Sequence, residues 1–170
     1  MPRTLILEPT RELAAQVADN FDTYGKYNQL NKALIIGGSS MIEQTKILDR
    51  GVDVLIATPG RLLDLFERGG LLLSDVKILV IDEADRMLDM GFIPDIEKIV
   101  SIIPKIRQTL LLSATMPPEI RRLAELFLMN PKEISVSKPS TLGESITQNL
   151  ILIEHKSKRD LNGLQKKNET

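Results

Sequence analysis

Three carboxylates within four residues stand out in this sequence: Asp82, Glu83 and Asp85 directly follow the apolar run 78–81. Such a run is typical of a buried strand, whose carboxyl end would carry the acidic side chains. In P-loop nucleotide hydrolases, a carboxylate at this position holds phosphate-bound Mg²⁺, often through water, and a neighbouring carboxylate activates the attacking water. Asp82 and Glu83 are therefore candidates for these roles, with Asp82 at the metal. The alternative interpretation is an acidic first turn of a helix.

Three other turns follow an apolar run in the same way, and each lies where a helix should begin. They are Pro9-Thr10-Arg11-Glu12-Leu13, Thr58-Pro59-Gly60-Arg61 and Ser113-Ala114-Thr115. For each turn alone, the simpler interpretation is helix capping by a Thr hydroxyl, with Pro near the first turn. A helix N-terminus also offers unpaired amides and a partial positive charge to an anion. Several such turns together could hold the phosphates of a nucleic-acid backbone.

Arg11 and Arg61 would place a charged fork beside two of these turns, and Gly37-Gly38 would allow close backbone approach beside a third. Such a surface contacts phosphates and sugars rather than bases. It therefore requires neither a basic composition nor many aromatic residues. This agrees with the composition of the chain, which has 22 basic and 23 acidic residues and only 4% aromatic residues.

The elements that must position these turns alternate between short apolar runs and segments of helical periodicity. Strands are predicted at 4–7, 33–36, 52–57, 78–81 and 109–112, and helices at 11–24, 40–48, 61–67, 96–103 and 120–127. Continuously apolar strands separated by helices indicate an α/β fold, a doubly wound parallel sheet with helices on both faces. Ligands bind such sheets at the carboxyl ends of the strands, where the turns described above lie.

The rest of the composition excludes several classes of site. Cysteine is absent and His155 is the only histidine, so disulfides, thiolate chemistry and a zinc site are not expected. No apolar run is long enough for a membrane span and no secretion signal is present, which predicts a soluble cytoplasmic protein without a membrane partner. After a last strand at 134–136, the composition predicts one domain over 1–138, a linker at 139–148 and an incomplete further segment at 149–170.

The ordered set PTREL, GG, TPGR, DEAD and SAT is similar to the motif series of DEAD-box ATP-dependent RNA helicases, and the stretch 86–92 also matches. Residues 56–64 resemble the bacterial RhlE-like subgroup. The resemblance covers essentially the whole chain. It implies the first RecA-like motor domain of a P-loop NTPase, with ATP and Mg²⁺ as cofactors, RNA as the partner, and residues 149–170 as the start of a second motor domain.

The resemblance also implies a role for each matching residue. Asp82 would hold water-coordinated Mg²⁺, Glu83 would activate the hydrolytic water, and Asp85 would bond to the turn from Ser113 to Thr115, which links hydrolysis to strand separation. Glu12 would position Arg61, and the helix after Arg61 would bend the bound strand. The RNA backbone would be held by Thr10, Arg11, Gly38, Thr58, Pro59, Gly60 and Arg61.

The chain departs from the family pattern before PTREL, where an adenine-reading motif and a Gly-rich phosphate loop would stand. The only Gly-Lys pair, Gly25-Lys26, lacks the spacing of that loop. We therefore expect a chain truncated at both ends, without its P-loop strand and inactive alone, whose parent is an RNA helicase. An RNA-binding module that does not hydrolyse ATP is an alternative. A DNA helicase is another, which the combination of PTREL and TPGR disfavours.

Overall fold

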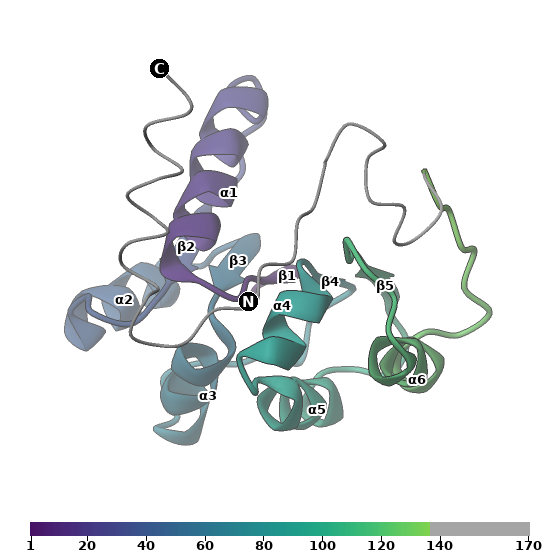
Figure 1. Ribbon diagram of the computed structural model, residues 1–170. Helices are drawn as coiled ribbons and strands as arrows, with labels where there is room; N and C mark the ends of the chain where they lie inside the picture. Colours follow the sequence, from purple (N-terminus) through teal and green to yellow (C-terminus); the bar gives the residue numbers. More distant parts are fainter. Residues whose placement is uncertain (137–170) are drawn as a thin grey trace, which may run out of the picture. The chain divides into compact units, whose positions relative to one another are not determined.

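The structure is a computed structural model and describes residues 1–136. Within them, five short strands form one parallel sheet with the order β2-β3-β1-β4-β5 (Figure 1). The strands are β1 Thr4–Leu7, β2 Lys32–Ile35, β3 Val54–Ala57, β4 Ile78–Ile81 and β5 Gln108–Leu111. Leu7, the last residue of the central strand, is in register with Ala57 and Ile81. The carboxyl ends of the three inner strands are therefore level, and side chains that follow them lie close together.

Six helices are found in the described part of the chain: α1 Arg11–Tyr24, α2 Met41–Asp49, α3 Pro59–Glu67, α4 Ala84–Asp89, α5 Ile93–Ile102 and α6 Pro118–Phe127. The five predicted helices are all present, with ends shifted by a few residues at most positions. The sequence did not predict α4, because six residues are too few to show a helical period. None of these helices is long and apolar enough to cross a membrane.

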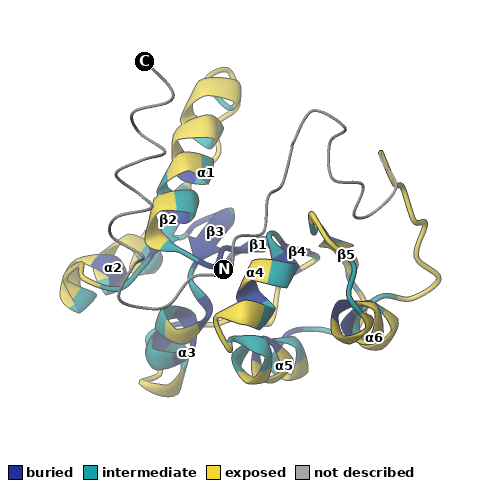
Figure 2. Ribbon diagram, in the orientation of Figure 1, coloured by how far each residue is buried: buried dark blue, intermediate teal, exposed yellow. Residues whose placement is uncertain are grey.

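The helices cover the two faces of the sheet unequally. Apolar residues of α3, α4, α5 and α6 pack on the face that carries Leu5, Leu55 and Leu79, with α2 at the margin. Among residues 1–136, α1 is the one helix that packs on the other face, and its Ala14 and Ala18 lie against strand residues of β1 and β3. The predicted doubly wound α/β fold is thus confirmed. Figure 2 shows that burial is concentrated in β1 and β3 and falls towards β5.

The far edge of the sheet differs from the prediction. In the part of the chain that the structure describes, β5 pairs with β4 alone, and Leu110 on this strand is 40% exposed. The strand predicted at 134–136 is wrong, since these residues are irregular and the side chains of Ile134 and Val136 are 88% and 99% exposed. Residues 134–136 do not join the described sheet, whose order ends at β5, so an apolar composition alone did not make them a strand. The predicted linker at 139–148 and the segment 149–170 lie outside the described residues.

Candidate functional site

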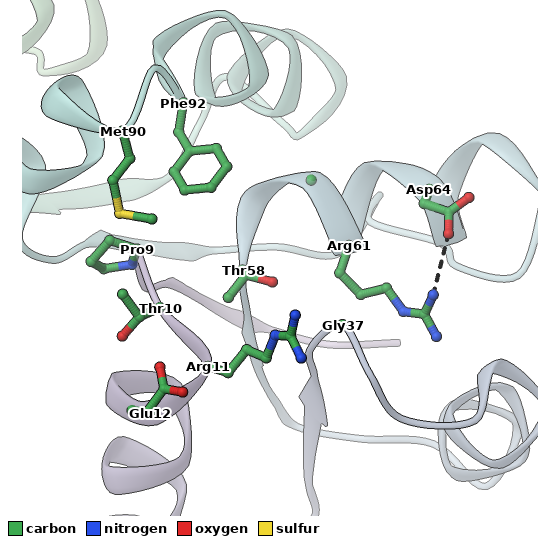
Figure 3. Close-up of a pocket in the computed structure, with 11 residues that line it drawn as sticks. Pro9, Thr10, Arg11, Glu12, Gly37, Thr58, Arg61, Asp64, Met90 and Phe92 are labelled. Atoms are coloured by element: carbon green, nitrogen blue, oxygen red, sulfur yellow. Dashed lines mark hydrogen bonds and ion pairs between the residues drawn. The ribbon is translucent and has the colours of Figure 1, made fainter.

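A groove of about 520 Å³ lies where the turns after β1, β2 and β3 meet (Figure 3). It brings together residues from the PTREL, GG and TPGR turns, which are far apart in the sequence. Asp64, Met90 and Phe92 also line it. They lie in the stretches 56–64 and 86–92 that carry the family resemblance, but no role was predicted for them. The lining residues are Pro9, Thr10, Arg11, Glu12, Gly37, Thr58, Gly60, Arg61, Asp64, Met90 and Phe92.

The helix starts beside the groove differ in how they are capped. Thr10 precedes α1, and its hydroxyl accepts a hydrogen bond from the Leu13 amide at 3.3 Å. Thr58 precedes α3, but its side chain makes no capping hydrogen bond. Capping is therefore confirmed for Thr10 and wrong for Thr58, whose hydroxyl remains available to a ligand. Pro59 was predicted to contact a backbone ligand, yet its ring is buried in the first turn of α3 and does not line the groove.

The glycine turn lies directly against Arg11. A Cβ atom on Gly38 would be 2.6 Å from Nη1 of Arg11, and Gly38 also has a φ of +85°, which favours glycine. Figure 3 shows the Arg11 side chain next to Gly37. Arg11 is exposed, and within residues 1–136 it forms no hydrogen bond or ion pair. Its guanidinium donors are therefore free to bind an anion in the groove.

Arg61 is held firmly, with its side chain only 15% exposed. Its Nε donates to Gln44 Oε1 at 3.0 Å, Nη1 to Asp64 Oδ2 at 3.3 Å, and Nη2 to the Ser39 carbonyl at 3.0 Å. The prediction that Glu12 positions Arg61 is wrong, since in the described residues its carboxylate partner is Asp64. Positions three apart on a helix are neighbours, whereas Glu12 belongs to α1.

The acidic turn begins where β4 ends. The Asp82 amide donates to the Leu7 carbonyl at 3.1 Å, and Asp82 Oδ1 accepts from the Glu83 amide at 2.8 Å. Glu83 has φ 50° and ψ 47°, the left-handed region, and α4 starts directly after it. For a residue other than glycine this conformation costs about 1–2 kcal/mol. Such strain is concentrated at functional sites, where the surrounding structure maintains it.

Asp85 joins the acidic turn to the turn after β5, as predicted. Its Oδ2 accepts from the Thr115 amide at 2.8 Å and from the Thr115 hydroxyl at 2.7 Å, while its own amide donates to Ser113 Oγ at 3.1 Å. Burial raises the pKa of Asp85, but the hydrogen bonds lower it by a larger amount, so the pKa lies below its usual value. The Thr115 hydroxyl does not cap α6, which begins after Pro117.

A fourth carboxylate, Glu8, follows β1 and was not identified from the sequence. The residue is 1% exposed, and its Oε1 has no hydrogen-bond partner among residues 1–136. Burial, followed by the charges of Asp82 and Glu83, raises the pKa of Glu8 to about 7. A charged residue directly after the apolar run 4–7 was the available signal, but it resembled an ordinary surface residue at the end of a strand.

The chemistry of these residues suits a hydrated cation more than a directly bound one. In residues 1–136, no three His, Asp or Glu side chains converge to hold a metal ion. The orphaned oxygen of Glu8 and its raised pKa nevertheless show that negative charge is concentrated at this end of the sheet. Asp82 has one hydrogen bond on its carboxylate, which leaves Oδ2 for a magnesium-bound water. Asp82 therefore fits Mg²⁺ held through water.

The parallel sheet, the groove of helix N-termini and the bonded pair of turns after β4 and β5 define a RecA-like α/β domain. The DEAD/DEAH box helicase family matches residues 1–123, and the chain belongs to this family. The family resemblance of the motifs is thereby confirmed. The RhlE-like subgroup stays a prediction.

Named relatives agree with this assignment. The chain is 48% identical over 157 residues to the ATP-dependent RNA helicase DeaD of Mycobacterium tuberculosis, covering 92% of this chain and 28% of that protein. It is 47% identical over 154 residues to DEAD-box ATP-dependent RNA helicase 40 of rice, Oryza sativa, covering 89% and 19%. The crystal structure of a DEAD box protein from Methanococcus jannaschii matches with a TM-score of 0.73 and 45% identity, over 75% of this chain and 35% of that one. The chain thus spans less than a third of the length of these two curated relatives.

Proposed function

We propose that this chain is part of an ATP-dependent RNA helicase, to which it contributes one RNA-backbone groove and the carboxylates that act in ATP hydrolysis. The observation that carries the proposal is the meeting of the PTREL, GG and TPGR turns in one groove. Relatives named as ATP-dependent RNA helicases support the activity. A cytoplasmic location and a bacterial source belong to the proposal as well, although the rice relative is nearly as similar as the mycobacterial one.

RNA would be held by its phosphates and riboses. The first turns of α1 and α3 present backbone amides at the groove, and Arg11 adds donors that no described residue engages. The Thr58 hydroxyl is free to bond a phosphate or a ribose. None of these groups distinguishes one base from another, so binding would depend on salt and not on sequence.

Hydrolysis would use the acidic turn. Bound Mg²⁺ would neutralise phosphate charge, with Asp82 holding its water ligands. Glu83 would orient the attacking water and accept its proton. Asp85 would transmit the state of this turn to Ser113 and Thr115 through its hydrogen bonds. The backbone cradle for the ATP phosphates is not among the residues described, so this part of the activity is proposed for the protein as a whole.

The RNA half of the proposal is tested by titrating the 170-residue chain into labelled single-stranded RNA at several salt concentrations. We expect binding that weakens with salt. Arg11→Ala should weaken binding about tenfold and reduce the salt slope by about one. Arg122→Ala, an exposed change on α6 outside the groove, is the matched control. Absence of salt-dependent binding, or equal effects of the two substitutions, would contradict the proposal.

A second candidate function is an RNA-binding module that does not use ATP. The groove favours it, because its free donors and helix N-termini need no nucleotide. Two measurements separate the two functions: the same RNA titration with and without Mg²⁺ and ATP, and ATP hydrolysis after the chain is placed in a complete relative. ATP hydrolysis stimulated by RNA supports the helicase. RNA binding that nucleotide does not change, together with no ATP hydrolysis, supports the module.

A further inference from the structure

Gln44 has a position that no motif explains. It is the only buried residue of α2. In the described chain, Gln44 and Glu8 are the two buried residues with a polar or charged side chain. Gln44 is 3% exposed. A buried amide is stable only when both its donor and its acceptor are satisfied.

Both ends of the Gln44 amide are used, and they reach two different segments. Nε2 donates to the Ile36 carbonyl at 2.9 Å, directly after β2 and before the glycine turn. Oε1 accepts from Arg61 Nε at 3.0 Å. Arg61 in turn donates to the carbonyl of Ser39, on the other side of the glycines. A closed set of hydrogen bonds thus links α2, the two ends of the glycine turn and α3.

The linked turn is the one that lies against Arg11. Gly37 and Gly38 lie between the two carbonyls that Gln44 and Arg61 hold, at Ile36 and Ser39. The close approach of Gly38 to Arg11 therefore depends on where this turn is fixed. A guanidinium has five N–H donors, and each of the three Arg61 nitrogens uses one in the bonds described. Two donors remain for a ligand in the groove, and their direction is set by the bonds already made.

We propose that Gln44 is the positioning residue of the RNA groove, acting through Arg61, which holds the Ser39 end of the glycine turn, rather than by touching RNA. This inference rests on the proposed function, because it concerns the same groove. Glutamine suits the position because one side chain must donate to a carbonyl and accept from a guanidinium. Methionine, of similar length, does neither. Glutamate keeps the acceptor for Arg61 but has no donor for Ile36.

The test measures RNA affinity in a double-mutant cycle of the 170-residue chain, with single-stranded RNA as the probe. Gln44→Met removes both hydrogen bonds of the amide. Loss of the bond to Arg61, which orders a charged group, should weaken binding about fivefold. In an Arg61→Ala background the same change should weaken binding less than twofold, because Gln44 acts through Arg61. A substitution that only loosens the fold would weaken binding equally in both backgrounds.

Two further variants provide the controls. Gln44→Glu should restore affinity to within about twofold of the wild type, since the acceptor for Arg61 is retained, while the melting temperature stays low because Ile36 loses its donor. Thr45→Val removes the neighbouring hydroxyl bond to the Met41 carbonyl without touching Arg61, and should leave affinity unchanged. Additive losses in the cycle, or no rescue by Gln44→Glu, would overturn the proposal.

A measurement without RNA separates this inference from the proposed function. In the wild-type chain, NMR should show the Arg61 Nε–H exchanging with water at least tenfold more slowly than the Arg11 Nε–H. Equal exchange rates would overturn the inference whether or not RNA binds and whether or not Gln44→Met folds. Slow exchange together with absence of RNA binding would instead contradict the proposed function alone.

Discussion

The two halves of the sheet differ in how completely they are built. Around β2, β3 and β1 both faces are covered, and Arg61 in the groove is held by three hydrogen bonds. Around β4 and β5 the described helices cover one face, and Glu83 adopts a left-handed conformation. Glu8, which follows β1 and lies near Asp82 and Glu83, has an unpaired buried oxygen. The groove is therefore preformed. The acidic turn keeps unsatisfied charge and strain that a bound cation and phosphate would relieve.

The short helix α4 connects these halves. It starts directly after Glu83, and the residue that ends it, Met90, lines the groove. Asp85 in its first turn bonds to the turn after β5. The six residues of α4 therefore separate the acidic turn from the groove. The two sites are neighbours, but Asp82, Glu83 and Asp85 do not line the groove.

The largest effect is expected at Glu83, in the incomplete half. When this chain replaces the matching 157-residue segment of the mycobacterial helicase DeaD, Glu83→Gln should lower kcat of ATP hydrolysis about 10²–10⁴-fold. RNA affinity should be unchanged, because Glu83 does not line the groove. Undiminished steady-state hydrolysis would refute the role of Glu83. A parallel loss of RNA affinity would show that the two sites are not separate.

The next effect compares one apolar residue from each half. Ile56 is fully buried under α1, whereas Leu110 on β5 is 40% exposed. Ile56→Ala should lower the free energy of unfolding by about 2–5 kcal/mol, and Leu110→Ala by less than about 1 kcal/mol. Urea unfolding followed by circular dichroism measures both. Similar losses would mean that the two halves are packed alike.

The pH dependence of stability should come largely from Glu8. Its pKa rises from 4.5 to about 7 on folding, so the folded state binds this proton more tightly than the unfolded state. The stability that the protonated group contributes is present below about pH 4.5 and is lost as the pH rises to about 7. The full loss is about 3 kcal/mol at 1.36 kcal/mol per pKa unit. Glu8→Gln should abolish this loss in metal-free urea unfolding at pH 5 and pH 8. An equal loss in the wild type and the variant would assign the effect to other groups.

The sequence predicted the fold well because short apolar runs mark the strands of a covered parallel sheet. The prediction of a strand at 134–136 was wrong, because strand formation there depends on pairing and not on composition. Helix α4 was not predicted, because it is too short to show periodicity. The sequence placed the turns of the groove together because parallel strands end at one edge. The hydrogen-bond partners of the site side chains were harder to predict from the sequence: Asp64 and Gln44, not Glu12, bind the Arg61 guanidinium. The burial of Gln44 and Glu8 depends on how helices and turns pack, which the sequence does not show.

The central claim is that the groove binds RNA in this chain without help from the acidic turn. Hydrogen–deuterium exchange of the 170-residue chain, with and without single-stranded RNA, tests it most directly. We predict slower exchange on RNA binding at residues 9–13, 37–39 and 58–61, and no change at 82–85 or 113–115. Protection at 82–85 alone, or no protection in the three groove segments, would contradict the account.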